Sequence, residues 1–218
     1  MAQSGIHAFT GIILSKFLKY EKELIPSLIF GLILPDIDII FVAIGLVGFK
    51  STFIMHSVFF TTIIYLVFLS LSEITSNKKF EIIGKGISIG ILIHIIMDIL
   101  FWFKAVYLFW PFETNYALIE YNNDFLINIL LALEFILFRA YGWFLIKKFI
   151  DNPRKGGWFI KYISKWTKTE FFLFLLFALL IYLEIPQYKY RAFFVIMYIP
   201  SLIMALISTY ILRDVLNH

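Results

Sequence analysis

The sequence contains no cysteine and few charged residues. Of its 218 residues, 16% are charged, whereas 61% are hydrophobic and 20% are aromatic. A soluble domain of average composition has about 25% charged and about 45–50% apolar residues, so this composition excludes a soluble fold and indicates an integral membrane protein. The missing cysteines exclude disulfides and thiolate ligands. Any transition-metal site must therefore use histidine and carboxylate side chains.

Other common signals are missing as well. The sequence has no Gly-rich phosphate loop, no zinc-peptidase motif and no internal repeat, and its N-terminal segment lacks the basic region of a signal peptide. The net charge of +4 arises from basic residues between apolar runs. This pattern indicates membrane topology and not nucleic-acid binding.

Long apolar runs predict an all-α, polytopic membrane protein. A spanning helix needs about 20 apolar residues. The run at 24–48 is long enough but contains Pro35, which should break or kink the helix, and residues 4–18 predict a short N-terminal helix. We therefore expect a helical bundle of about six spans plus this short helix. The clearest spans are residues 52–72, 80–101, 124–150, 170–186 and 191–213.

The distribution of charge divides the chain into three regions. Residues 1–150 hold the ionisable side chains inside apolar runs, residues 151–169 form a basic loop, and residues 170–218 form a C-terminal pair of membrane helices. Lys and Arg concentrate on the cytoplasmic side of a membrane. We therefore predict that the basic loop is cytoplasmic, that the acidic loop 102–123 is external, and that the protein lies in the cell (inner) membrane.

Ionisable residues inside the apolar runs are the strongest functional signal. A charged side chain at the centre of a membrane helix costs about 2.5–3.5 kcal/mol on insertion scales, so its presence indicates a site. His94 and Asp98 are four residues apart and share one helix face. Asp36 and Asp38 directly follow Pro35. With the predicted topology, His7, His56 and Glu134 also fall in the outer half of the membrane.

Several of these residues also have a purely structural interpretation. Asp36 could cap the helix that follows Pro35. His56 could be a hydrogen-bonded core histidine, and Glu134 could pair with Arg139, five residues further on.

The balance of charge favours a metal site. Four internal carboxylates, those of Asp36, Asp38, Asp98 and Glu134, accompany one internal cation, Arg139. A divalent cation would stabilise the ionised carboxylates and accept histidine ligands. A pair of such ions can also activate water for phosphoester hydrolysis.

Short motifs occur in a fixed order between residues 5 and 135. They are Gly5-Ile6-His7, Leu34-Pro35-Asp36-Ile37-Asp38, His56-Ser57, His94 to Asp98, Trp110-Pro111 and Glu134-Phe135. This ordered set resembles the YdjM-like family of membrane-bound metal-dependent hydrolases, which is in turn similar to zinc-dependent phospholipase C. The chain departs from the family pattern at Ile39, Ser51, Thr52 and Phe53, and Met55 replaces the threonine before the histidine.

The resemblance implies a membrane-embedded metal-dependent hydrolase. In the expected reaction, metal-activated water cleaves a phosphoester of a membrane lipid. Lipid is therefore expected both to surround the protein and to serve as its substrate. Zinc is the first choice because of the histidines, as one or two ions, and manganese is the alternative. Glu134 and Asp36 are the catalytic candidates, and Arg139 is the candidate for substrate binding. The expected metal ligands are His7, Asp36, Asp38, His56, His94 and Asp98.

Two other functions use the same residues. Buried Asp, Glu and His side chains near a broken helix are also typical of ion- or proton-coupled transporters. A non-enzymatic membrane scaffold with a structural metal is the third hypothesis.

Overall fold

The structure, a computed structural model, describes residues 4–17, 23–38, 54–101, 107–112, 124–183, 185 and 187–216. In these residues the secondary structure is helical, without strands, which confirms the all-α class. The elements are α1 (Ser4–Ser15), α2 (Leu24–Ile33), η1 (Leu34–Ile37), α4 (Val58–Thr75), α5 (Lys78–Phe101), α6 (Asp124–Asp151), α7 (Pro153–Gly156), η3 (Gly157–Phe159), α8 (Ile160–Tyr182) and α9 (Gln187–Ile211).

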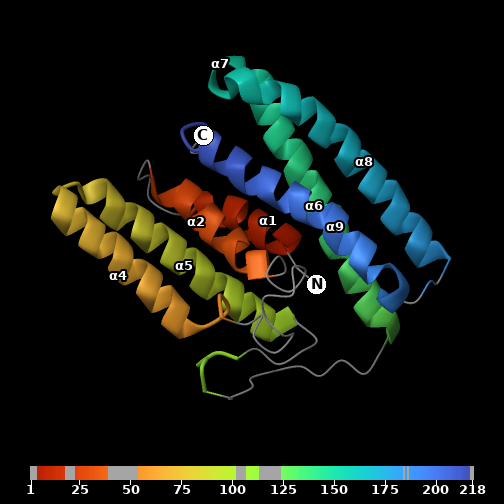
Figure 1. The fold of residues 1–218 in the computed structure, drawn as a ribbon, viewed down its shortest axis with the longest axis horizontal. Coiled ribbons are helices and arrows are strands. Elements are labelled where there is room, and N and C mark those ends of the chain that lie inside the picture. Colours follow the sequence, from red (N-terminus) through yellow and green to blue (C-terminus); the bar gives the residue numbers. More distant parts are fainter. Residues whose placement is uncertain are drawn as a thin grey trace.

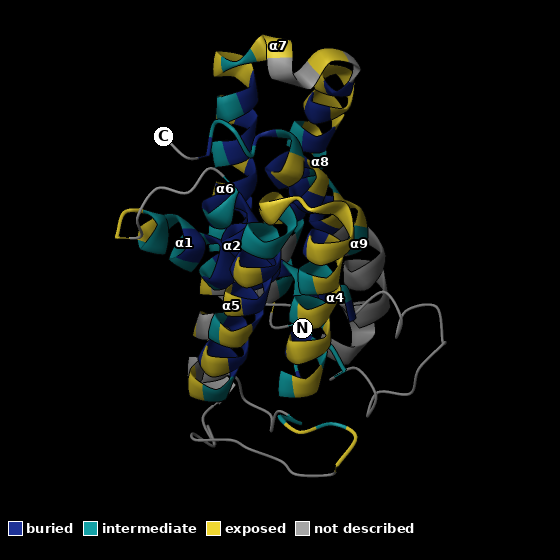
Figure 2. Cartoon of the chain, turned by 90° about the vertical axis from the view of Figure 1, so that its left-hand side faces the viewer, coloured by how far each residue is buried: buried dark blue, intermediate teal, exposed yellow. Residues whose placement is uncertain are grey.

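The helices form two groups with α1 and α2 between them. The antiparallel pair α4 and α5 lies on one side, and α6, α8 and α9 lie on the other (Figure 1). Helix α2 packs mainly on α5, and α1 packs on both α2 and α6. Residues of α2 are largely buried, whereas α4 carries many exposed residues (Figure 2).

The contact between α2 and α5 depends on small residues. A Cβ atom on Gly31 would collide with the backbone of Ile87, and one on Gly90 would collide with the backbone of Leu28. Small residues allow membrane helices to approach this closely. The close approach brings the carbonyl groups of α2 next to the side chains of α5.

The helix that starts at residue 24 ends before Pro35, as predicted. Helix α2 stops at Ile33, and the 3-10 helix η1 contains Pro35 in its first turn. Proline cannot donate an amide hydrogen bond, so the α-helical pattern stops there. Asp36 and Asp38 consequently lie in a tight turn at the end of α2, and both are buried. The remainder of the predicted run, residues 39–48, lies outside the described residues.

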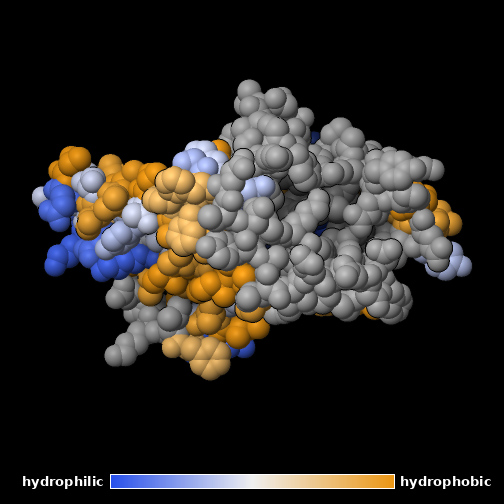
Figure 3. Space-filling model, turned by 90° about the horizontal axis from the view of Figure 1, so that it is seen from below, coloured by the Kyte–Doolittle hydropathy of each residue, from blue (hydrophilic) through white to orange (hydrophobic). Residues whose placement is uncertain are grey.

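Helix α4 packs on α5 with one face and exposes an apolar face on the other side. Its exposed residues include Phe59, Ile63, Leu66 and Ile74. Hydrophobic atoms cover much of the visible surface on the α4–α5 side (Figure 3). Such a surface is suited to lipid and not to water.

The described residues contain two helices that are long and apolar enough to cross a membrane, Val58–Thr75 and Lys78–Leu100. Three shorter apolar helices are Gly5–Ser15, Leu24–Ile37 and Ile199–Ile211. The prediction of about six spans is therefore not confirmed.

The predicted basic loop 151–169 is largely helical, and this boundary was wrong. Residues 153–159 form α7 and η3, and α8 begins at Ile160 rather than at residue 170. Phe159, Ile163, Trp166 and Leu173 are buried at intervals of three, four and seven residues. This spacing is that of one buried helix face, which explains why a segment rich in lysine is nevertheless a helix.

Candidate metal centre

The six predicted metal ligands lie together in the structure. His7 is on α1, Asp36 is in η1, Asp38 follows η1, His56 precedes α4, and His94 and Asp98 are near the end of α5. Because α4 and α5 are antiparallel, the start of one and the end of the other are on the same side (Figure 1). Five of the six residues are buried, and the side chain of His56 is 13% exposed.

Three ligand atoms meet at the centre of this cluster. The Nε2 atoms of His56 and His94 are 3.1 Å apart, and each lies 3.3 Å from Oδ2 of Asp98. Zinc bonds of about 2.0–2.1 Å in a tetrahedral site place neighbouring ligand atoms about 3.3–3.4 Å apart. The three separations therefore fit three corners of such a tetrahedron.

Contacts at the other ring nitrogens fix the orientation of both histidines. Nδ1 of His94 lies 2.7 Å from the carbonyl oxygen of Leu32. A carbonyl only accepts hydrogen bonds, so Nδ1 carries a hydrogen, and in the neutral ring Nε2 presents a lone pair. Nδ1 of His56 lies 3.3 Å from Oδ2 of Asp38, which also accepts from the Met55 amide at 3.3 Å. Metal-bound histidines show this arrangement, in which the second nitrogen donates to a carbonyl or a carboxylate.

These contacts give Asp36 and Asp38 different positions. Asp38 contacts the outer nitrogen of His56, whereas Asp36 joins His56 and His94 in a group whose ligand atoms all lie within 4.8 Å of one another. The sequence predicts both aspartates as metal ligands, with Asp36 also a possible helix cap. The geometry instead favours Asp38 as the residue that positions His56.

His7 extends the cluster on the side of α1. Its Nε2 lies 3.4 Å from Oδ1 of Asp98, and its ring stacks on His94 with 3.8 Å between centroids. His7, His94 and Asp98 form a second group with ligand atoms within 4.8 Å. Both groups include His94, whose Nδ1 is occupied by Leu32, so only one nitrogen of His94 is available to an ion.

Protonated histidines or a bound cation can balance the carboxylates of this cluster. Nε2 of His56, Nε2 of His94 and Oδ2 of Asp98 lie 3.1–3.3 Å apart, so either a proton or a metal ion can be shared among these three atoms. The carboxylates of Asp38 and Asp98 make their ion-pair contacts with histidines. A divalent ion would compensate the carboxylates and use the lone pairs.

The remaining predicted site residues are on α6. Glu134 belongs to this helix, but its side chain is not described. Arg139 forms a buried ion pair with Glu170 of α8, and Trp166 Nε1 donates to Glu170 Oε1 at 2.6 Å. Thus Arg139 has a partner on a helix that contributes no ligand to the metal cluster.

Sequence reasoning missed Glu170 because the predicted helix began at that residue. The spacing of Ile163, Trp166 and Leu173 would have placed Glu170 on a buried face. The contacts of Leu32 and Met55 involve backbone atoms, which leave no residue-specific signal in a sequence.

The motif around Pro111 lies beside the metal cluster. The carbonyl of Leu108 accepts a hydrogen bond from the amide of Val58 at 2.9 Å, and Phe112 packs near Phe59. Segment 107–112 therefore contacts the start of α4, immediately after His56.

Comparison with protein families identifies the chain. The model of the YdjM inner membrane protein family matches residues 2–193. The chain belongs to this family. No match was found among curated proteins or among solved structures. Family membership and the two apolar helices together make this YdjM protein an inner membrane protein, as predicted. The departures at Ile39, Ser51, Thr52 and Phe53 lie outside the described residues.

Proposed function

We propose that this YdjM protein is a metal-dependent hydrolase that cleaves a phosphoester of a membrane lipid, with about six membrane spans and a site in the outer half of the bilayer. The main support is the meeting of His56 Nε2, His94 Nε2 and Asp98 Oδ2 at 3.1–3.3 Å. These distances fit tetrahedral coordination of zinc, and manganese is the alternative metal.

The protein groups around this point have distinct tasks. His56, His94 and Asp98 would hold one ion, with Asp36 or His7 as a further ligand. Leu32 and Asp38 would hold the two imidazole rings in place before substrate arrives. Once bound, a divalent ion would lower the pKa of a water molecule and polarise a phosphoryl oxygen. Glu134 remains a candidate general base from its sequence position.

The surroundings of the cluster favour a lipid substrate. The cluster lies beside the start of α4, whose exposed face is apolar, and His56 is its most accessible member. It is also at the end of the α4–α5 pair that is opposite to the turn before Lys78 and Lys79. If that basic turn is cytoplasmic, the cluster is near the external headgroup region, where lipid phosphates are found.

Cysteine labelling tests this orientation, because the chain has no cysteine of its own. Single cysteines at Lys79 and Phe112, both exposed, should react with a membrane-impermeant maleimide from opposite sides of the membrane. We expect Phe112→Cys to label in intact cells and Lys79→Cys only after lysis. Labelling of both in intact cells would contradict the outward-facing site.

Turnover tests the chemistry. The purified protein, loaded with zinc or manganese, should release a phosphate-containing product from membrane phospholipids, as measured by lipid mass spectrometry. Asp98→Asn should abolish the release, whereas Ser88→Ala, a buried change on the same helix, should not. Bound metal without turnover would support a scaffold, and absence of tightly bound metal would support the transport hypothesis.

A further inference from the structure

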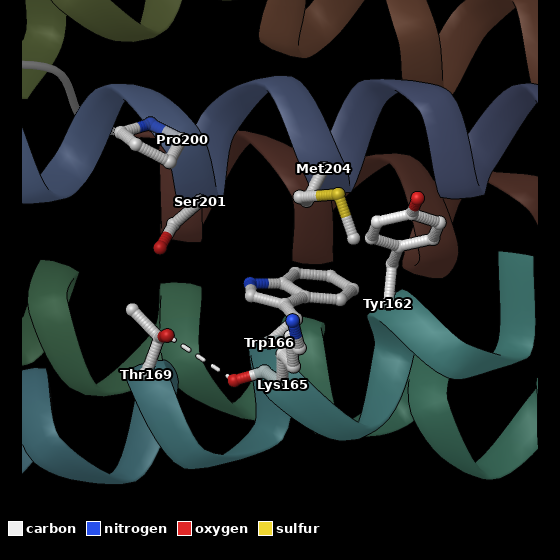
Figure 4. Close-up of a pocket in the computed structure, with 7 residues that line it drawn as sticks. All are labelled: Tyr162, Lys165, Trp166, Thr169, Pro200, Ser201 and Met204. Atoms are coloured by element: carbon white, nitrogen blue, oxygen red, sulfur yellow. Dashed lines mark hydrogen bonds between the residues drawn. The ribbon is translucent and has the colours of Figure 1, made fainter.

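A groove between α8 and α9 contains a second set of polar side chains. It has a volume of about 190 Å³ (Figure 4). Its walls are apolar at Trp166, Pro200 and Met204, and polar at Lys165, Thr169 and Ser201. None of these residues belongs to the metal centre.

The hydroxyl group of Ser201 is the unusual feature of the groove. Ser201 is 1% exposed, and no hydrogen-bond partner for its Oγ is found in the described part of the chain. In Figure 4 this hydroxyl points from α9 towards Thr169 on α8. Thr169 Oγ1 donates to the carbonyl of Lys165 at 3.1 Å, so its hydrogen is already used. A buried hydroxyl without a partner is unfavourable, and a ligand with an acceptor oxygen would satisfy Ser201.

The groove lies where α8 changes from basic to apolar. Lys161, Lys165 and Lys168 are exposed on the first half of the helix. Beyond residue 170 the exposed residues are apolar and include Phe172 and Leu179. If α8 spans the membrane as the sequence predicts, this change lies at the boundary between headgroups and hydrocarbon, and the lysines place that boundary in the cytoplasmic leaflet.

The polar groups are arranged by depth along α8. Thr169 follows Lys165 by one helical turn, about 6 Å at 1.5 Å per residue, and Ser201 lies opposite Thr169 (Figure 4). Lys165 is therefore at the end of the groove that is nearer the headgroups. The Ser201 hydroxyl is one helical turn closer to the hydrocarbon. Tyr162, 47% exposed, flanks the headgroup end, as aromatic residues commonly do at membrane interfaces.

We propose that this groove binds an anionic phospholipid of the cytoplasmic leaflet. The ammonium group of Lys165 contacts the phosphate, and the hydroxyl of Ser201 donates to an ester carbonyl, which lies one glycerol unit deeper. The acyl chain then follows the apolar walls at Trp166 and Met204. Basic pockets between membrane helices on the cytoplasmic side bind anionic lipids in this way. The site is independent of the proposed metal chemistry.

Quenching of Trp166 by brominated lipid tests this proposal. The full chain is placed in phosphatidylcholine nanodiscs that contain increasing amounts of dibrominated phosphatidylglycerol or, in a parallel series, dibrominated phosphatidylcholine. The Trp166 signal is the difference from the Trp166→Phe variant. We expect phosphatidylglycerol to be preferred about fivefold, the effect of one lysine near a membrane surface.

Two variants and a control specify the contacts. Lys165→Gln should remove the preference for phosphatidylglycerol, and Ser201→Ala should weaken quenching by both lipids. Lys79→Gln, an exposed lysine on the turn between α4 and α5, should leave the preference unchanged. Native mass spectrometry of retained phosphatidylglycerol provides the same comparison without substitution of Trp166.

Three results would overturn the proposal. They are equal quenching by the two lipids, an unchanged preference in Lys165→Gln, and displacement of phosphatidylglycerol by excess inorganic phosphate. The last result would identify a site for free anions and not for lipid.

Discussion

Two buried polar groups in this protein differ in how their charge is balanced. In the α6–α8 group, Arg139 pairs with Glu170, which also accepts from Trp166. In the group formed by α1, η1, α4 and α5, histidine nitrogens face the carboxylate of Asp98. Both groups are buried: Glu170 and His94 are each 0% exposed.

The two groups differ in whether they offer ligand atoms to a metal ion. A guanidinium and a carboxylate neutralise each other, and such buried ion pairs are commonly structural. Two histidine nitrogens 3.1 Å from each other and 3.3 Å from a carboxylate oxygen are balanced by protons or by a cation. The presence of a buried charged side chain in a membrane helix is therefore less informative about function than the kind of side chain that it contacts.

The largest expected effect is the loss of metal from a variant of the histidine–aspartate group. His94→Ala removes a nitrogen that both candidate ligand groups share. Metal affinity should fall on the order of a hundredfold or more, since loss of an outer contact alone costs about 10–100-fold. Competition with a chromophoric chelator measures this. Ser88→Ala, on the same helix, is the control, and an equal loss in both variants would indicate a general packing defect.

The second prediction concerns the ion pair. Glu170→Gln removes the carboxylate that pairs with the buried Arg139 and should lower the free energy of unfolding by about 3–5 kcal/mol. Metal affinity should not change. The double variant Arg139→Met/Glu170→Leu should be closer to the wild type in stability, because apolar residues of similar size often replace such pairs at little cost. Urea denaturation in detergent measures all three proteins. A loss of metal in Glu170→Gln would show that the Arg139–Glu170 pair and the histidine–aspartate group depend on each other, and it would contradict this prediction.

The third prediction separates Asp36 from Asp38. If Asp38 positions His56, Asp38→Asn should weaken metal binding by about 10–100-fold, the usual effect of an outer contact. Asp36→Asn, which alters a member of a ligand group, should weaken it more. Isothermal titration with zinc ranks the two variants, and the reverse order would make Asp38 the direct ligand.

The smallest effect is expected at the start of α4. Ser57 caps this helix by accepting from the Phe60 amide at 3.1 Å. Ser57→Ala should destabilise the protein by about 1 kcal/mol, and Ser57→Thr should restore most of that. Because His56 precedes the cap, metal affinity should fall less than in Asp38→Asn. Thermal unfolding with and without zinc measures both effects, and a larger loss of affinity than in Asp38→Asn would contradict a purely local role.

The sequence predicted the members of the metal cluster but not their individual roles. His7, Asp36, Asp38, His56, His94 and Asp98 could be found because ionisable residues are rare in apolar runs. The break at Pro35 was also predictable, since proline stops the hydrogen-bond pattern of a helix. The separate roles of Asp36 and Asp38 could not be predicted, because they depend on how η1 turns beside His56.

The C-terminal half was harder to predict. Lysines in residues 160–169 suggested a loop, although the buried positions Ile163 and Trp166 follow a helical period. The sequence suggested Glu134, on the same helix, as a partner of Arg139, and the side chain of Glu134 is outside the described part of the structure. Glu170 is 31 residues away from Arg139 in sequence, and only the packing of α8 on α6 brings them together.

Elemental analysis of the purified protein is the most direct test of whether His56, His94 and Asp98 bind a metal ion. Wild type, Asp98→Asn and Glu170→Gln are prepared in parallel, so that one buried carboxylate of each polar group is converted to an amide. We expect tightly bound zinc or manganese near one ion per chain in the wild type and in Glu170→Gln, and at most a tenth of that in Asp98→Asn. Equal metal content in all three proteins, or none in the wild type after zinc loading, would contradict this expectation.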